Sequence, residues 1–358
     1  MTDRSAETSF AAAELDAVCR RVLAALGTPA DLAAITADAL VTANLRGHDS
    51  HGVQRLLQYA GWIANGQVDP AGRPERARTR GGTAVVDGHW GLGQPAARLA
   101  TRTAAELAAE HGVSAVTITR CNHIGRLGEY VETLAGAGCV GLAFCNSGPI
   151  VAPSGGSRRT FGTNPLAWAA PRAGGPALVL DFSTAAAAEG KVRLSLARAE
   201  PVAPGTLIDA GGRPSTDPAD LYAGGALLPF GGHKGSGLSF MIELVGGLLS
   251  GMGAAPMPDY GGGNGTVLLA LSVDAFTDPA GFAAGAAAFA DRVHEAPGGG
   301  REPAVFLPGE VETTARTTRS TAGIPVPDTI RLEVTALLGP AGAELGRFAL
   351  LPTDERTP

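Results

Sequence analysis

Lysine is almost absent from this chain. Among its 28 lysine and arginine residues, only Lys191 and Lys234 are lysines. The two residue types are not interchangeable, because lysine carries a compact ammonium with three donors and arginine a rigid planar fork. Both lysines stand next to glycine, in the segments EGKVR and GGHKGSG. We therefore treat these two segments as candidate binding loops.

The sequence also lacks the features of several protein classes. It has no apolar run of about eighteen residues that could span a membrane, and its N-terminus, MTDRSAETSF, has no apolar signal-peptide core. The formal net charge is -6, and lysine and arginine form no cluster. Cys19, Cys121, Cys139 and Cys145 show no CxxC spacing. We expect a cytoplasmic protein with reduced cysteines, no structural zinc, and no nucleic-acid or membrane partner.

The periodicity of apolar residues predicts a helical first third and then a mixed region. In the first third, apolar residues recur at three- and four-residue steps. From about residue 79, short apolar runs predict strands that alternate with helices. The predicted helices are 11–26, 29–46, 53–64, 94–111, 125–138, 235–251 and 279–294, and the predicted strands are 83–88, 113–122, 139–147, 176–183 and 266–273.

These elements predict a mixed α/β (α+β) fold with two lobes, which a chain of 358 residues is long enough to form. Residues 1–78 are predicted to form an N-terminal helical region. Residues 231–358 are expected to join this region and complete a helical lobe. Residues 79–230 are predicted to form a lobe around a mixed sheet.

Two segments imitate the dinucleotide-binding pattern GxGxxG, and both fail its structural requirements. GAGCVG, residues 136–141, lies between a helix and a strand, which reverses the required order. GLGQPA, residues 91–96, follows a strand and precedes a helix. The next strand, however, ends at Thr119 and Arg120, with no carboxylate for a ribose hydroxyl. The sequence therefore predicts a non-Rossmann fold.

The segment GHDSHGVQRL places two of the seven histidines three residues apart. His51 is a candidate proton donor at physiological pH. Arg55, four residues on, would share its helix face with Tyr59 and offer a fork for a substrate carboxylate. A plainer interpretation also stands: the histidines pack near a helix start, and Asp49 or Ser50 caps the helix.

Further candidate residues follow predicted strands or precede predicted helices. In CNHIGRLGEY, His123 is placed in a strand-to-helix loop, where α/β proteins often carry chemistry, although it could be a simple turn residue. Asp181 ends the strand in LDFST and could orient a histidine, bind a ribose hydroxyl or cap a helix. His233 and Lys234 precede a helix whose start suits phosphate. FGTNP predicts a turn, and FLPGE a strand end followed by Glu310.

The histidines leave a second chemistry open. His48, Asp49, His51, His123 and His233 could supply ligands to a metal ion. None has the HExxH or paired-cysteine spacing of a familiar metal site. A metal-dependent hydrolase is therefore kept as a minor alternative.

Seven motifs in the same order resemble those of the type 2 malate/L-lactate dehydrogenase family, which includes ureidoglycolate and sulfolactate dehydrogenases, 2,3-diketo-L-gulonate reductase and Δ1-piperideine-2-carboxylate reductases. They are DSHGVQRL, NHIGRLGEY, FGTNPLAWAAP, LDFSTAAAAEGK, GGRPSTDP, FGGHKGSGLSFMIELVGGLLSG and LPGE. The resemblance implies a non-Rossmann oxidoreductase, usually a homodimer. It implies hydride transfer between NAD or NADP and a small carboxylate substrate, a 2-hydroxy or 2-oxo acid. Reduction of a cyclic imine is the alternative.

The resemblance also assigns residue roles. It implies that His51 is the general acid/base, with Ser50 beside it and Asp181 completing a relay. His123 would be a second active-site histidine, Arg55 would bind the substrate carboxylate beside Tyr59, and no metal would be needed. The helical lobe would then bind substrate and the sheet lobe cofactor. The implied cofactor contacts are His123, Ile124, Gly125, Arg126, Leu127, Asp181, Phe182, Ser183, His233, Lys234, Gly235, Pro308, Gly309 and Glu310.

Two departures from the family pattern concern the substrate. Many members carry an aromatic residue where this chain has Ile124, and a second where it has Ser236. The HIGRLGEY form, with Arg126 and Glu129, resembles a subgroup with broad hydroxycarboxylate activity. The resemblance therefore favours a hydroxycarboxylate without specifying which one.

Overall fold

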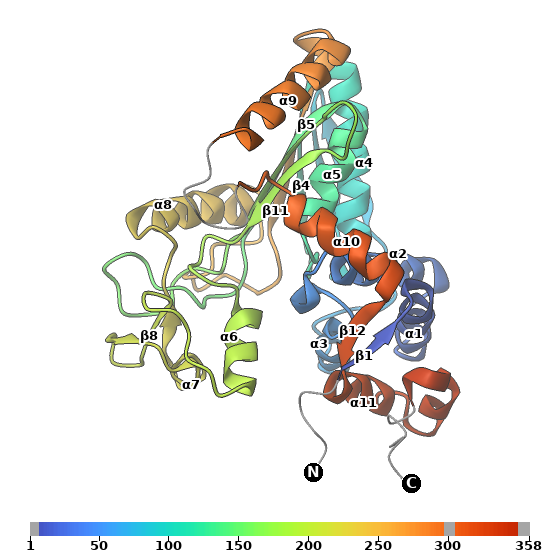
Figure 1. Ribbon diagram of the computed structural model, residues 1–358, viewed down its shortest axis with the longest axis vertical. Coiled ribbons are helices and arrows are strands. Elements are labelled where there is room, and N and C mark those ends of the chain that lie inside the picture. The colour runs from blue at the N-terminus through green and yellow to red at the C-terminus, as the bar shows by residue number, and fades with distance from the viewer. Residues whose placement is uncertain (1–6, 297–304, 350–358) are drawn as a thin grey trace. The chain divides into compact units, whose positions relative to one another are not determined.

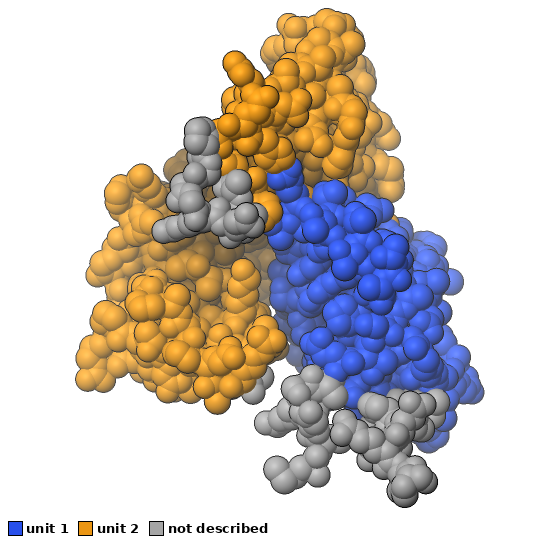
Figure 2. Space-filling view, in the orientation of Figure 1, with its two compact units in different colours: residues 1–73, 90–95, 310–358 blue, residues 74–89, 96–309 orange. Residues whose placement is uncertain are grey.

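The structure is a computed structural model that describes residues 7–296 and 305–349. Its contacts divide the chain into two compact units, coloured separately in Figure 2. Unit 1 comprises residues 1–73, 90–95 and 310–358, and unit 2 comprises residues 74–89 and 96–309. Each unit has a hydrophobic core of its own.

Unit 1 is mainly helical, as the apolar periodicity predicts. The helix predicted at 11–26 is α1 (Ala12–Ala25), and it buries Leu15, Val18, Cys19, Val22 and Leu23, which recur at three- and four-residue steps. An antiparallel pair joins the N-terminal strand β1 to β12, far along the chain. The other elements of unit 1 are α2 (Ala30–Leu45), the 3-10 turn η1 (Asp49–His51), α3 (Arg55–Ala64), α10 (Glu310–Ala322), α11 (Asp328–Ala336), η4 (Gly339–Phe348), β1 (Glu7–Phe10) and β12 (Ile324–Pro327).

Unit 2 is built on a seven-stranded mixed sheet in the order β2-β3-β4-β11-β5-β6-β7. The pair β3 and β4 is parallel, and every other neighbouring pair is antiparallel. This order confirms the predicted mixed, non-Rossmann architecture, because a Rossmann sheet is parallel and doubly wound. The strands are β2 (Glu75–Arg80), β3 (Thr83–Asp87), β4 (Val113–Thr119), β5 (Cys139–Cys145), β6 (Leu166–Ala170), β7 (Leu178–Phe182) and β11 (Thr266–Ser272).

The two faces of this sheet are covered differently. Strands β4 and β5 alternate buried and less buried residues, as a sheet with one well-packed face requires. Helices α4 (Gly93–His111) and α5 (Gly128–Gly136) pack on the buried face and complete the core of unit 2 (Figure 1). On the opposite face, β5 and β11 contact a π-helix, η2 (Glu243–Leu248), that directly continues α8 (His233–Ile242).

A smaller part of unit 2 comprises residues between β5 and β6 and residues after β7, and it has its own apolar cluster. Val151, Val192, Leu207 and Leu221 are among its buried residues. It contains α6 (Glu189–Ala197), α7 (Pro218–Tyr222) and a three-stranded sheet of β8 (Leu207–Ile208), β9 (Pro214–Ser215) and β10 (Ala226–Leu227). Within the described part of unit 2, β11 is followed by η3 (Val273–Ala275) and α9 (Pro279–His294).

The structure differs from the predicted lobe boundaries in the segment 231–309. We expected this segment to join the helical lobe, but it lies in unit 2. The reason is β11, which hydrogen-bonds between β4 and β5 in the middle of the sheet. Residues 90–95, expected in the sheet lobe, belong to unit 1.

Three element boundaries also differ from the prediction. Helix α5 begins at Gly128, because Gly125 has a φ of +81°, which is outside the helical region. The helix predicted over 235–251 is α-helical only to Ile242 and then becomes a π-helix. FLPGE contains no described strand; a turn at residues 308–309 leads directly into α10.

Candidate functional site in two parts

The first group of candidate residues lies on one turn of unit 1. His51 ends the 3-10 turn η1, in which His51 N donates to His48 O (2.9 Å) and Gly52 N donates to Asp49 O (3.0 Å). The Ser50 Oγ lies 3.0 Å from Nδ1 of His51. The Ser50 hydroxyl therefore hydrogen-bonds one ring nitrogen of His51, and this contact orients the imidazole.

Asp49 does not cap the helix that carries Arg55, and neither does Ser50. Helix α3 begins at Arg55 after Gln54, without a side-chain cap. The carboxylate of Asp49 instead accepts from Asn44 Nδ2 (2.6 Å) and forms an ion pair with Arg319 of α10. The capping prediction is wrong because partners from α2 and α10 occupy this carboxylate.

Arg55 lies against the same turn. Its Nε donates to the backbone oxygen of Ser50 (2.5 Å), and its Nη1 donates to Gln58 Oε1. The guanidinium of Arg55 therefore contacts the backbone of Ser50, the residue next to His51. The four-residue spacing of His51 and Arg55 predicts this proximity.

Tyr59 belongs to the core of unit 1. It is 1% exposed, its ring stacks on Trp62 at 5.8 Å between centroids, and its hydroxyl accepts from Gln94 Nε2 (2.6 Å). Burial raises the pKa of Tyr59 to about 12, which keeps the phenol protonated. These contacts give Tyr59 a packing role within unit 1.

The second group lies in unit 2, around the end of β7. Asp181 Oδ2 accepts a hydrogen bond from Gly128 N (2.7 Å), the first residue of α5. The carboxylate therefore caps a helix, but a helix from another part of the chain. A carboxylate at a helix N-terminus is also favoured by the helix dipole.

Three further motifs meet β7 beside Asp181. Val179 N donates to Pro308 O (3.2 Å), which brings LPGE alongside the strand. The ring of Phe182 packs edge-on against Phe230, with centroids 5.5 Å apart, just before the HKG segment. Thr184 N donates to Thr163 O (2.9 Å) in FGTNP. Motifs spread over nearly 190 residues of sequence are thus gathered around one strand end.

The residues gathered there fit a ligand that carries phosphates and hydroxyls. His233 and Lys234 are exposed at the start of α8, a ten-residue helix whose N-terminus favours anions. Gly309 has a φ of +87°, and a Cβ on it would press on Val179 at 3.2–3.3 Å. Only glycine therefore lets LPGE approach β7 this closely. Lys191, by contrast, lies exposed on α6, beside Glu189 and Arg193 in sequence.

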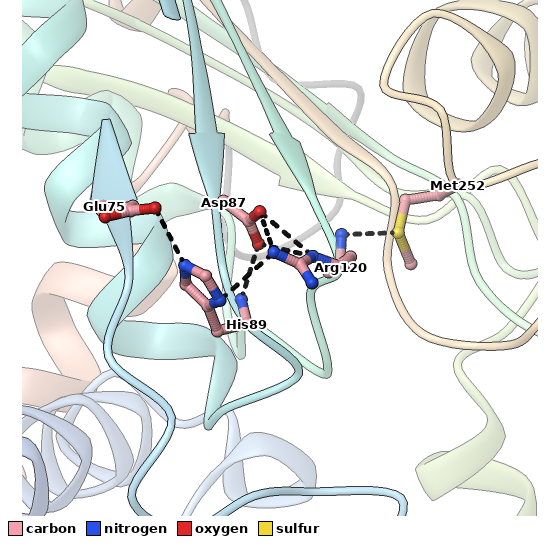
Figure 3. A network of polar contacts seen from close by, with 5 residues as sticks. All are labelled: Glu75, Asp87, His89, Arg120 and Met252. Carbon is pink, nitrogen blue, oxygen red and sulfur yellow. Dashed lines mark hydrogen bonds and ion pairs between the residues drawn. The ribbon is translucent and has the colours of Figure 1, made fainter. Parts of the chain in front are cut away.

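His123 lies in the irregular segment between β4 and α5, which confirms its placement in a strand-to-helix loop. A polar network stands at the start of this segment (Figure 3). Arg120, at a φ of +46°, donates from Nε to both oxygens of Asp87 (2.9 and 3.0 Å) and from Nη2 to His89 Nδ1 (3.2 Å). His89 Nε2 lies 3.2 Å from Glu75 Oε1. This network ties the loop after β4 to the loop after β3.

The four cysteines are free and buried. Burial raises the pKa of the Cys121 and Cys145 thiols well above the usual range. Buried thiols of this kind are inert, because the thiolate is the nucleophile and the metal ligand. The cysteines therefore belong to the packing of the two units.

The alternative metal chemistry has no assembled ligand set in the described part of the chain. Across residues 7–296 and 305–349, no group of three or more histidine, cysteine, aspartate or glutamate side chains is arranged to hold a metal ion. No helix within the same ranges is long and apolar enough to cross a bilayer.

Sequence reasoning missed Arg319 and the Asp87–Arg120 pair. Arg319 stands in TTARTTRSTA, which carries no motif, and lies 270 residues from its partner Asp49. Asp87 and Arg120 lie near the ends of two predicted strands, 83–88 and 113–122, and these strands are parallel neighbours in the sheet. The position of Asp87 and Arg120 near strand ends was the available signal in the sequence. From it, an ion pair between the two residues could have been predicted.

Comparison with known proteins places these features in a family. The family model for malate/L-lactate dehydrogenase matches residues 10–334. An L-lactate dehydrogenase of Cupriavidus necator is 38% identical over 310 residues, which cover 84% of this chain and 88% of that protein. A Delta(1)-pyrroline-2-carboxylate reductase of Burkholderia multivorans is 43% identical over 202 residues, covering 56% and 59%.

A solved structure agrees with this assignment. The sulfolactate dehydrogenase of Methanocaldococcus jannaschii superposes with a TM-score of 0.84 at 29% identity, covering 95% of this chain and 98% of that one. The match spans both units, so the architecture as well as the motifs is shared. This chain therefore belongs to the malate/L-lactate dehydrogenase family and is an oxidoreductase that uses a nicotinamide cofactor.

Proposed function

We propose that this protein transfers a hydride between NAD or NADP and a small 2-hydroxy or 2-oxo acid. The observation that carries the proposal is the turn of unit 1 on which Ser50 Oγ contacts His51 Nδ1 at 3.0 Å and Arg55 binds the adjacent backbone. A proton donor and a carboxylate-binding fork are thus held within one turn. A 2-oxo acid presents the matching pair, a carbonyl next to a carboxylate.

In this proposal, each residue of the turn has a separate task. With Nδ1 held by Ser50, the Nε2 of His51 protonates the oxygen of the 2-oxo acid, and in reverse removes the hydroxyl proton. Arg55 binds the substrate carboxylate and so fixes the position of the carbon beside it. Asp181 is proposed as the third member of a relay with Ser50 and His51. The nicotinamide, when bound, supplies or accepts the hydride.

The cofactor is proposed to bind the residues around the end of β7. These are the His123–Leu127 loop, Asp181 to Ser183, His233 to Gly235, and Pro308 to Glu310. Three contacts support the proposal: Asp181 with Gly128, directly after the first loop, Val179 with Pro308, and Phe182 with Phe230, three residues before His233. Lys234 would act as a point charge on a phosphate. His123 would act as the second histidine of the site.

Tyr59 keeps a part in the proposal, but an indirect one. Its ring packs in unit 1 one turn after Arg55. We propose that it supports the substrate side of the site through the packing of α3, with its hydroxyl held by Gln94.

Reduction of a cyclic imine is the second candidate. The specific support is the 43% identity to the pyrroline-2-carboxylate reductase. The same two groups would serve: Arg55 would bind the ring carboxylate, and His51 would deliver a proton to the amine nitrogen. The two activities differ in whether the double bond ends in oxygen or nitrogen.

We also propose that the protein is a cytoplasmic homodimer. Its four free, buried cysteines suit a reducing compartment. Large apolar side chains of the segment 235–251 are exposed, with Met241 at 53% and Leu249 at 65%. Large apolar side chains gathered on one surface favour a protein partner, and a second copy of this chain is the partner proposed.

The test is a spectrophotometric assay with a matched histidine control. Oxidation of NADH and of NADPH would be followed with pyruvate, oxaloacetate, 2-oxoglutarate, phenylpyruvate and Δ1-piperideine-2-carboxylate. We expect turnover with an open-chain oxo acid, and a kcat lower by about 100- to 10,000-fold in His51→Ala. His111→Ala, on α4 and outside the proposed site, should match wild type. Equal kcat in His51→Ala and wild type would refute the proposed role.

A further inference from the structure

Arg319 of helix α10 forms an ion pair with Asp49, in the turn that carries His51. Arg319 Nη1 lies 2.6 Å from Asp49 Oδ1, and Nη2 lies 2.9 Å from Oδ2. Two parallel contacts of this kind fix the relative orientation of both groups, unlike a single point contact. Nη1 of Arg319 also donates to Asn44 O (2.5 Å), so the guanidinium is bound on two sides.

Asn44 holds the same carboxylate from α2. Its Nδ2 donates to Asp49 Oδ1 (2.6 Å), and its Oδ1 accepts from Val53 N (2.8 Å), just past the turn. Asn44 is 2% exposed. A Cβ at Gly52 would overlap with the Asn44 side chain, so only glycine leaves room for this arrangement. Asp49 and Val53, on either side of His51, are therefore both anchored to one buried amide.

Helix α10 contacts the same segment at other points along its length. Glu312 Oε1 lies 3.4 Å from His48 Nε2, and Arg46 Nη1 donates to Thr313 Oγ1 (3.3 Å). Helices α10 and α2 pack against each other over this region. The side chain of Arg319 is 19% exposed and that of Asp49 is 46% exposed, so only the arginine end of the ion pair is shielded from water and from screening by salt.

We infer that Arg319 is a positioning residue that acts through Asp49 to set the place of His51. The inference rests on the proposed role of His51 as proton donor. Arg319 touches Asp49, and Asp49 directly precedes Ser50 and His51. When the bidentate ion pair is lost, the turn keeps its backbone hydrogen bonds and the Asn44 contact to Asp49 Oδ1, but it loses the two contacts that fix the orientation of the carboxylate. A displacement of the imidazole by about 1 Å slows proton transfer by up to about 100-fold.

A purely structural role would give a different result. If the ion pair only fastened α10 to α2, its loss would lower the melting temperature and leave kcat near that of wild type. A residue that acts through His51 must instead lower kcat, and must have no further effect once the imidazole is gone. Non-additivity of this kind is measured by a double-mutant cycle.

The experiment uses the full-length protein with its nicotinamide cofactor and the best oxo acid of the panel. The variants are Arg319→Met, Arg319→Lys, Asp49→Asn, His51→Ala and the double variant His51→Ala/Arg319→Met, with Arg316→Met, exposed on the same helix, as the matched control. We expect kcat to fall about 10- to 100-fold in Arg319→Met. The KM for cofactor should stay within about twofold of wild type. Arg319→Lys, which keeps a charge but not the fork, should retain part of the activity.

The outcomes separate this inference from the proposed function. A lowered kcat in Arg319→Met that disappears in the His51→Ala background supports the inference. Wild-type kcat in both Arg319→Met and Asp49→Asn, with His51→Ala impaired, overturns it and leaves the proposed function standing. Wild-type kcat in His51→Ala overturns both. If Arg319→Met does not fold, a wild-type kcat in Arg319→Lys and Asp49→Asn overturns the inference equally.

Discussion

Asp87 is a single residue that holds two loops of unit 2. Partial burial would raise the pKa of its carboxyl, but the hydrogen bonds from Arg120 and from His89 N outweigh burial and lower it. The ion pair therefore favours the charged form of Asp87 in the folded state. Since Arg120 is 46% exposed, the ion pair contributes only modestly to stability.

This lowered pKa predicts a pH-dependent loss of stability. The unfolded carboxyl has a pKa of about 3.9. Because the folded value is lower, the stabilisation is complete above that pH and is lost as pH falls through the folded pKa. Urea unfolding of wild type and Asp87→Asn should therefore show a gap near neutral pH that shrinks below about pH 4. A gap that stays constant into acid would contradict the assignment. Asp87→Asn/Arg120→Met should unfold like Asp87→Asn.

At the scale of elements, the continuation of α8 into a π-helix coincides with a buried carboxylate. Glu243 is 3% exposed. Its Oε1 accepts from Asn164 Nδ2 (2.9 Å), and its Oε2 accepts from Asn146 Nδ2 (2.9 Å) and Ala255 N (2.9 Å). The end of β5, the FGTNP turn and the segment after the π-helix thus meet on one side chain. π-helical segments are often found at functional sites, where they redirect side chains.

The Glu243 junction gives a prediction about element packing. In Glu243→Gln, an amide NH2 replaces one acceptor oxygen and faces a donor, so at least one buried group loses its partner. We expect the free energy of unfolding to fall by about 2–3 kcal/mol in urea titrations. Glu295→Gln, which removes a surface ion pair with Arg292, should change it by less than about 0.5 kcal/mol. Equal effects of the two substitutions would show that the buried network contributes little.

At the scale of the whole molecule, the surface of unit 2 bears the strongest sign of a partner. Leu244, Leu248 and Leu249 are exposed along the end of α8 and the π-helix. Beside them, a groove on the sheet face opposite α4 and α5 is lined by Phe144, Val267 and Leu269, among others. Such a surface is costly to leave in water. Burial by a second copy would remove this apolar surface from water.

The dimer proposal predicts the effect of a double substitution. Leu248→Glu/Leu249→Glu should shift the protein from dimer to monomer in light scattering coupled to size-exclusion chromatography, because two buried charges per subunit oppose association. Leu194→Glu, at a 48% exposed position on α6, is the control and should leave the mass unchanged. A wild-type protein that elutes as a monomer at micromolar concentration would contradict the dimer.

The apolar pattern of the sequence predicts most of the long helices and central strands and much of the unit 1 turn. The apolar steps of α1 and the alternation in β4 and β5 depend on neighbours a few residues apart, and local spacing records them. The same holds for Ser50, His51 and Arg55, which share one turn. These residues could therefore be predicted together from GHDSHGVQRL alone.

The partners of these elements and residues are known only from the folded structure. Three features join residues that are far apart in sequence. They are the insertion of β11 between β4 and β5, the capping of α5 by Asp181, and the ion pair between Arg319 and Asp49. Pairings of this kind leave no periodicity, since either partner alone is an ordinary strand, acid or arginine. For the same reason, the predicted lobe boundaries missed the segment 231–309. Burial and hydrogen bonding select such partners only when the whole core forms, so spacing along the chain could not reveal them.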